Sequence, residues 1–287
     1  MRHGGQRHPN QTFEPFDFHN PFNLTSFRNN LLQAAVEYTS LARSMATLAF
    51  EVAPLCNDVM ADEVRLDANR FALMGQSTGS SVGAIVLGAE PMFASGILSG
   101  AGGSWIYNVA LKQEPLLIAE AVALVLGLEA DEPLDPFHPL ATLFQTAAEA
   151  TEAMNFARRW TDAPFSDSPP KNVLLIGGLI DGYFLPRMIA ALAMAGRFDL
   201  AGPSLDANLF DDITRMGAQQ VPLPAGPNRG DQSVYTLLYE ADGFDGHYVT
   251  FNLGAPKTAY RCWLASLARD GRAVLPFASD NPEAPCP

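Results

Sequence analysis

The sequence predicts an α/β fold, a mostly parallel β-sheet with helices on both faces. Short, continuously apolar segments alternate with longer segments in which apolar residues recur every three or four positions. Strands that are apolar along their whole length are typical of parallel sheets, because both faces of such sheets are buried. With 287 residues, 48% of them hydrophobic, the chain can bury the core of one large domain.

Apolar runs bounded by glycine or polar residues are predicted to be strands: Arg70–Met74, Phe93–Leu98, Val173–Ile176 and Ser233–Tyr239. Helical periodicity predicts helices that begin near Thr25 or Ser26, at Ser77, at Leu185 and at Thr258. The other segments are expected to be irregular: residues 1–22, a flexible loop at Ser99–Gly103, residues 202–232 and a frayed tail from Ser279.

We expect a single domain over residues 1–287, with a helical cap insertion over residues 105–165. The periodicity of this segment is mainly helical, and prolines divide it into separate helices. It lies between the second and third predicted strands, so it would be inserted between consecutive strands of the sheet.

Gly75-Gln76-Ser77-Thr78-Gly79 fits the G-x-S-x-G pattern of a nucleophile elbow, a tight strand-to-helix turn that lifts a serine above the sheet. An apolar strand precedes the pattern and a small-residue helix follows it, as the elbow requires. We expect Ser77 to be the nucleophile and the backbone N–H of Thr78 to stabilise an oxyanion. Gly75, Gln76 and Gly79 would shape the elbow, with glycines where any side chain would clash. The alternative is an ordinary Gly/Ser-rich turn.

A serine nucleophile needs a base, and the sequence offers five histidines. His247 is the predicted base, because it lies in a glycine-flanked loop after the last predicted strand and can reach the sheet edge of Ser77. The alternative is a structural loop histidine. His138 lies between two prolines and is expected to cap or pack a helix. The remaining histidines lie in the unpatterned N-terminal segment: His3, His8 and His19.

The base needs a carboxylate that orients it. Asp181 is the predicted acid, because it follows the third predicted strand and stands between serine and histidine in chain order. The alternative is a turn aspartate before a glycine. Asp206 is a competitor, whereas Asp242 and Asp245 are so close to His247 in sequence that we expect them to shape its loop.

The elbow, the strand-end aspartate and the loop histidine together resemble the α/β-hydrolase superfamily. Several stretches also resemble bacterial lipases and esterases related to virulence-factor lipases: Phe16–Asn30, Gly75–Gly83, Leu98–Gly103, Pro139–Arg158 and Gly246–Asn252. The resemblance implies hydrolysis of a small-molecule or lipid ester through an acyl-enzyme, with Ser77, Asp181 and His247 as the triad. It implies neither a metal nor an organic cofactor.

The resemblance is incomplete at the N-terminal end. Members of this family have further strands and an oxyanion loop before the elbow strand, whereas one clear helix precedes Arg70 here. We therefore expect an N-terminally incomplete hydrolase, with a sheet edge that needs a partner or another N-terminal segment to cover it. The second oxyanion donor is not identified, and His3-Gly4-Gly5 is a poor substitute. Loss of one donor costs about 10²–10³ in rate in a well-studied enzyme, so impaired activity is expected.

Three functions stay open. An esterase or lipase is the leading hypothesis, and another triad chemistry, such as that of a peptidase or lactonase, would use the same residues. A non-catalytic remnant that acts as a binding domain is the third, because the oxyanion loop is missing. Apolar residues of the cap suit acyl chains, although helix packing explains them equally well: Leu116, Leu117, Val122, Leu124, Leu140 and Phe144.

The charge and the distribution of apolar residues limit the possible binding partners and the location of the protein. A formal net charge of −13 argues against nucleic acid. No apolar run reaches the roughly 18 residues that span a bilayer. The first residues lack the apolar stretch of a signal peptide, and the family resemblance leaves a secreted or periplasmic location open.

The three cysteines are too few and too scattered for a disulfide framework or a zinc site. We expect Cys262 to be a buried thiol, with a bridge to Cys56 as the unsupported alternative.

Overall fold

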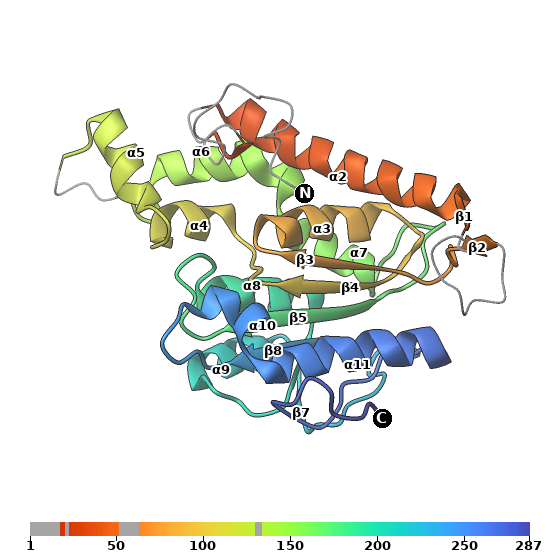
Figure 1. Ribbon diagram of the computed structural model, residues 1–287. Helices are drawn as coiled ribbons and strands as arrows, with labels where there is room; N and C mark the ends of the chain where they lie inside the picture. The colour runs from red at the N-terminus through yellow and green to blue at the C-terminus, as the bar shows by residue number, and fades with distance from the viewer. Residues whose placement is uncertain (1–17, 21–22, 52–62, 130–133) are drawn as a thin grey trace.

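The structure is a computed structural model that describes residues 18–20, 23–51, 63–129 and 134–287. At its centre lies a six-stranded sheet with the order β3-β4-β5-β8-β6-β7, in which all neighbouring strands are parallel. Helices lie on both sides of this sheet (Figure 1). The predicted fold class, a mostly parallel sheet between helices, is confirmed.

The strands of this sheet are β3 (Phe71–Gln76), β4 (Phe93–Ser99), β5 (Asn172–Gly178), β6 (Asp199–Ala201), β7 (Gln220–Val221) and β8 (Val234–Tyr239). A separate antiparallel pair consists of β1 (Ala49–Glu51) and β2 (Glu63–Arg65). The helices are α2 (Leu24–Thr47), α3 (Thr78–Ala89), α4 (Trp105–Leu111), α5 (Ile118–Leu126), α6 (Pro139–Ala148), α7 (Ala153–Trp160), α8 (Pro186–Gly196), α9 (Ala207–Arg215), α10 (Val249–Asn252) and α11 (Gly254–Asp270). Short 3₁₀ turns are η1 (Glu149–Thr151) and η2 (Gly246–Tyr248).

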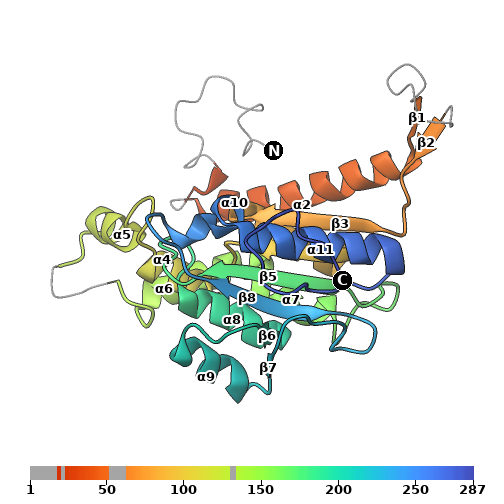
Figure 2. The same cartoon turned by 60° about the horizontal axis from the view of Figure 1, so that its bottom comes forward.

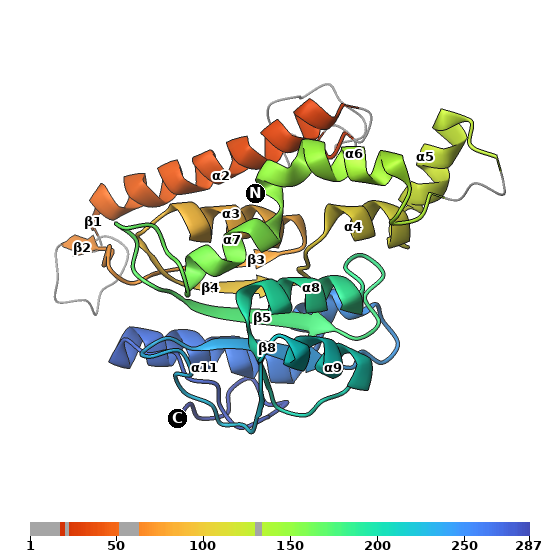
Figure 3. The ribbon, with the colours of Figure 1, turned by 180° about the vertical axis from the view of Figure 1, so that it is seen from behind.

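Alternating residues of the inner strands β4, β5 and β8 fill two hydrophobic cores, one on either face of the sheet. In β5, Val173 and Leu175 belong to the core under α3, α7 and α8, whereas Leu174 and Ile176 belong to the core under α11. Figure 3, seen from behind, shows α7 and α8 against the sheet, with α2 farther out beyond α3. Burial on both faces explains why the strands are continuously apolar in sequence.

Two buried tryptophans hold the helical layers in place, one by joining two helices and the other by joining a helix to the sheet. The indole N–H of Trp160, at the end of α7, donates to the carbonyl of Ala84 in α3 at 3.0 Å. The indole of Trp263, in α11 on the opposite face, donates to the hydroxyl of Ser95 in β4 at 2.8 Å. Both side chains are fully buried, so each anchor combines a large apolar contact with a satisfied N–H donor.

The segment between β4 and β5 is helical, as its periodicity predicts. It contains α4, α5, α6 and α7, and α7 packs against α3 and α8 as part of the main helical layer. Figure 2 shows α5 farther from the sheet than the other three. The predicted division into one domain with a cap over residues 105–165 stays a prediction.

Three segments differ from the sequence-based expectation. Asn23, rather than Thr25 or Ser26, caps α2, because its side-chain oxygen accepts from the backbone N–H of Ser26 at 3.0 Å. Residues 202–232 are not only loop, since α9 and β7 lie within them. The short amphipathic turn of α9 buries Leu209 and Ile213 four residues apart, a signal that the surrounding proline and glycine residues obscure.

The C-terminal tail is also more ordered than expected. Cys262 in α11 is not a free thiol, because it forms a disulfide with Cys286 near the end of the chain. The hydroxyl of Thr258 donates to the carbonyl of Asn281 at 2.8 Å, so the tail lies along α11. The prediction of a frayed tail is therefore wrong, and Cys56 lies outside the described residues.

Strand β3, which carries the elbow, lies at one edge of the described sheet. Met74 in this strand is 45% exposed, an unusual degree for a large apolar residue of a sheet. Coverage of this edge by a partner or another segment stays a prediction. Among the described residues, no helix is both long and apolar enough to cross a membrane.

Candidate active site

Ser77 occupies the turn between β3 and α3, with φ 57° and ψ −124°. This left-handed backbone is strained for a residue with a Cβ and is typical of a nucleophile elbow. A Cβ on Gly75 would lie 2.4 Å from the carbonyl oxygen of Gly79, so only glycine fits there. A Cβ on Gly79 would meet nothing within 4 Å. The close approach of strand and helix therefore requires the first glycine of the motif but not the second.

Hydrogen bonds hold the elbow against the neighbouring strand β4. The backbone N–H of Ser77 donates to the carbonyl of Ser99 at 2.9 Å. The hydroxyl of Ser80 lies 2.8 Å from the carbonyls of both Gly75 and Ser99. In the described part of the chain, neither the hydroxyl of Ser77 nor the backbone N–H of Thr78 makes a hydrogen bond, so both are free to meet a substrate.

Asp181 and His247 form a buried pair. Nδ1 of His247 lies 3.0 Å from Oδ2 of Asp181, and the two residues are only 2% and 3% exposed. Oδ1 of Asp181 accepts backbone N–H bonds from Tyr183 at 2.8 Å and Phe184 at 2.7 Å. Because Nδ1 faces the carboxylate, Nε2 is the ring nitrogen that remains for a reacting group.

His247 lies against the residues that flank Ser77. The side-chain amide of Gln76 donates to the carbonyl of His247 at 2.7 Å. A Cβ on Gly100, which follows the hydrogen-bond partner of Ser77 in β4, would lie 2.8 Å from Cε1 of His247. These contacts place the imidazole beside the elbow, while the structure contains no hydrogen bond between Ser77 and His247. Catalytic hydrogen bonds often tighten only when substrate binds.

Aromatic rings hold the imidazole plane. The ring of Tyr183 stacks on His247 with 4.3 Å between centroids, and Tyr248 meets the same imidazole edge-on at 5.3 Å. A hydrogen bond from Tyr248, followed by burial, raises the pKa of Tyr183, so its hydroxyl stays protonated. The ammonium of Lys112 lies 5.5 Å from the centre of the Tyr183 ring. Burial lowers the pKa of Lys112, and the negative charge of Asp181 opposes that shift.

The loop after β4 forms a packed wall beside the elbow. Gly100, Gly102 and Gly103 are all buried, and a Cβ on Gly103 would lie 2.3 Å from the side chain of Met154. Both oxygens of the buried Glu152 accept backbone N–H bonds at the start of α4, at 3.0 and 2.9 Å. The loop expected to be flexible over Ser99–Gly103 is thus tightly packed. Its glycines allow neighbouring side chains to lie close to the backbone, and they do not make the loop flexible.

His19 is a functional candidate that the sequence did not reveal. Its Nε2 lies 2.9 Å from the hydroxyl of Thr78, the residue whose N–H is the expected oxyanion donor. The ring also packs edge-on against Phe18 and faces Phe27 of α2. No periodicity marks this segment, so only the folded chain brings it to the elbow. His3-Gly4-Gly5 lies outside the described residues.

The competing residues have structural roles. Asp206 caps α9 by accepting from the backbone N–H of Asn208 at 2.9 Å. Asp245 accepts from the N–H of His247 at 2.8 Å and from that of Gly182, so it shapes the histidine loop as expected. His138 caps α6, also as expected.

The apolar residues of the expected cap divide into two kinds. Phe144 packs with Phe27 at 5.4 Å between ring centroids, which is ordinary helix packing. Leu116, Leu117 and Leu124 around α5 are 42%, 43% and 83% exposed. These leucines therefore serve neither the core nor an enclosed acyl pocket in this conformation.

Ser77 follows β3, Asp181 follows β5 and His247 follows β8, which is the chain order expected for the predicted serine, acid and histidine. The chain has an α/β fold, a parallel sheet with helices on both sides. No protein-family model matches the sequence, and neither does any curated protein.

Solved structures of known hydrolases match the chain at low identity. Acylaminoacyl peptidase from Pyrococcus horikoshii is 11% identical with a TM-score of 0.35, over 66% of this chain and 21% of that one. Acetyl xylan esterase 1 from Thermoanaerobacterium is 16% identical with a TM-score of 0.37, over 77% and 49%. A puromycin-hydrolysing peptidase from Mycobacterium tuberculosis is 14% identical with a TM-score of 0.40, over 70% and 22%. The chain thus spans less than two thirds of each of these proteins.

Proposed function

We propose that this protein hydrolyses carboxylic esters through a triad of Ser77, His247 and Asp181. The observation that carries the proposal is the buried Asp181–His247 hydrogen bond beside a serine with elbow backbone angles. A buried carboxylate that orients an imidazole next to an unbonded serine hydroxyl is an arrangement that activates a nucleophile.

The proposed reaction has two halves. Oγ of Ser77 attacks the ester carbonyl carbon as its proton passes to Nε2 of His247, and the N–H of Thr78 donates to the oxygen that becomes negative. The C–O bond of the ester then breaks, and the alcohol leaves with the proton from Nε2. A water molecule repeats the sequence on the acyl-enzyme, which releases the acid and restores Ser77. Asp181 holds the imidazole tautomer and stabilises the imidazolium in both halves.

Esters with an apolar acyl group are the proposed substrate class. The exposed leucines around α5 give this segment an open apolar surface that an acyl chain can contact. A net charge of −13 disfavours strongly anionic substrates.

The proposal is tested with p-nitrophenyl acetate, butyrate and octanoate, comparing the wild type with Ser77→Ala. We expect the wild type to release nitrophenolate with saturation kinetics and the Ser77→Ala variant to fall by at least about 10³-fold. Ser81→Ala is the matched control, because this neighbouring serine is buried in α3 and lies outside the proposed triad. Equal rates for wild type and Ser77→Ala would refute the proposal.

A further inference from the structure

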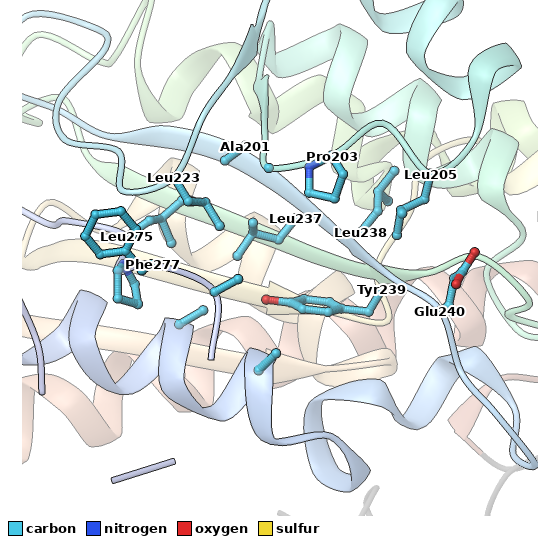
Figure 4. A pocket seen from close by; sticks show the side chains of 15 residues that line it. Ala201, Pro203, Leu205, Leu223, Leu237, Leu238, Tyr239, Glu240, Leu275 and Phe277 are labelled. Atoms are coloured by element: carbon cyan, nitrogen blue, oxygen red, sulfur yellow. The ribbon is translucent and has the colours of Figure 1, made fainter. Parts of the chain in front are cut away.

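An apolar pocket lies away from the elbow, between the end of β8, helix α11, the loop after β6 and residues 275–278 (Figure 4). Its walls are apolar and include Leu223, Leu237, Ala259 and Leu275. None of its lining residues belongs to the proposed triad or the elbow. Strand β8 lies three strand spacings from β3 in the sheet, about 14 Å at the usual 4.8 Å spacing.

The pocket has the size of a small organic molecule. Its volume is about 220 Å³. A protein cavity of about 150 Å³ holds benzene, so this pocket has room for one ring with a short substituent. An adjoining hollow shares Leu223, Phe277 and Ala278 with it. The side chain of Phe277 is 70% exposed, which places an accessible rim at this junction.

One polar group points into this apolar space. Figure 4 shows the hydroxyl of Tyr239 among the apolar side chains of the pocket. This hydroxyl has no hydrogen-bond partner in the described part of the chain, and the side chain of Tyr239 is partly exposed. The hydroxyl of the buried Tyr235, by contrast, donates to the carbonyl of Gly226. The Tyr239 hydroxyl is therefore available to donate a hydrogen bond to a ligand in the pocket.

The charge around the pocket selects the partner of that hydroxyl. Burial, and secondarily the charge of Asp280, raise the pKa of Tyr239, so the group is a donor at all ordinary pH values. Glu240 lies at the rim, so a carboxylate ligand would be repelled. A neutral ligand with one acceptor oxygen can accept a hydrogen bond from the Tyr239 hydroxyl and is not repelled by Glu240.

We propose that this pocket binds a small, neutral, mainly apolar molecule whose carbonyl or ether oxygen accepts a hydrogen bond from Tyr239. The site is independent of ester hydrolysis at Ser77, so failure of either proposal leaves the other standing. The wall formed by Leu275 is held by paired backbone hydrogen bonds with Ala225, at 2.8 and 3.1 Å, so it exists before a ligand arrives.

Acetophenone is the probe, because it combines one ring with one carbonyl group. Leucine methyl signals are followed by NMR during titration of the full chain. We expect saturable shifts at Leu223, Leu237 and Leu275, both in the wild type and in Ser77→Ala. Ethylbenzene, which lacks the oxygen, is expected to bind about three- to tenfold more weakly, the factor of one neutral hydrogen bond. Benzoate is expected not to bind.

Two variants separate the hydrogen bond from the shape of the pocket. Tyr239→Phe is expected to lower the affinity for acetophenone to that for ethylbenzene. Tyr260→Phe is expected to leave the affinity unchanged, because Tyr260 lies in α11 outside the pocket lining. Leu223→Trp fills the pocket and is expected to abolish binding of both probes. Absence of saturable shifts at these leucines, or equal binding of acetophenone to the wild type and Tyr239→Phe, would overturn the proposal.

Discussion

The two oxygens of Asp181 have separate tasks, and this separation makes one substitution informative. Oδ2 meets Nδ1 of His247, while Oδ1 accepts two backbone N–H bonds that hold the turn after β5. Asparagine can keep the backbone bonds through its carbonyl oxygen, but it offers His247 an N–H donor or a neutral oxygen in place of a carboxylate.

Asp181→Asn is therefore expected to keep its fold and lose its activity. In a serine protease, the equivalent change leaves the geometry intact and lowers kcat about 10⁴-fold, because the histidine takes the wrong tautomer. The measurement is kcat/KM for p-nitrophenyl butyrate together with a thermal melt. Activity within tenfold of the wild type would show that Asp181 does not orient the base.

His19 acts, in this account, through Thr78 rather than on the substrate. Its hydrogen bond to the Thr78 hydroxyl holds the residue whose backbone N–H is proposed to donate to the oxyanion. We expect His19→Phe and Thr78→Val each to lower kcat about three- to tenfold with little change in KM. The double variant is expected to fall no further than either single one, because both remove the same bond. Additive losses would contradict this coupling.

At the scale of the elements, the elbow depends on a backbone approach that one glycine permits. The carbonyl of Gly79 lies where a Cβ on Gly75 would have to go, and neither backbone can move without shifting β3 or α3. Gly79 faces open space and has no such constraint.

These glycines provide a matched pair of variants. Gly75→Ala is expected to displace Ser77 and abolish ester hydrolysis, at a cost in stability of about 1–3 kcal/mol from overpacking. Gly79→Ala is expected to retain more than half of the wild-type activity. Hydrolysis rates and thermal melts of both variants check the contrast. Equal losses in the two would show that the motif acts through something other than close approach.

The sequence predicted the elements that follow simple periodicity. The four principal strands and the helix after Ser77 were predicted, because each strand is a short apolar run, and β4, β5 and β8 are buried on both faces. The sequence also predicted that Asp181 and His247 lie close together, because the carboxyl ends of parallel strands meet at one sheet edge. It could not place His19, whose contact with Thr78 joins positions 59 residues apart with no pattern between them. Nor could it show α9, whose short apolar face lies among turn residues.

At the scale of the whole molecule, the disulfide joins α11 to the end of the chain. Cys262 and Cys286 are 24 residues apart, and the tail between them passes the lining of the Tyr239 pocket at Leu275 and Phe277. Closing a loop of this length restricts the unfolded chain and stabilises the folded one by about 3 kcal/mol.

Removal of this bridge is expected to lower the melting temperature by about 5–10 °C, from the usual relation between stability and Tm. The measurement is a thermal melt of the wild type with and without dithiothreitol. Cys286→Ser is expected to melt at the lower temperature in both conditions. An unchanged melting temperature of the wild type in dithiothreitol would show that the disulfide is absent or contributes little to stability.

The central claim is that Ser77 is an activated nucleophile, and covalent labelling tests it most directly. A fluorophosphonate reacts with a serine whose hydroxyl is activated, and mass spectrometry of the digested protein locates the adduct. We predict a single stoichiometric adduct on Ser77 in the wild type and in Ser81→Ala, with strongly reduced labelling in Asp181→Asn. Absence of an adduct on Ser77 in the folded wild-type protein would contradict the account.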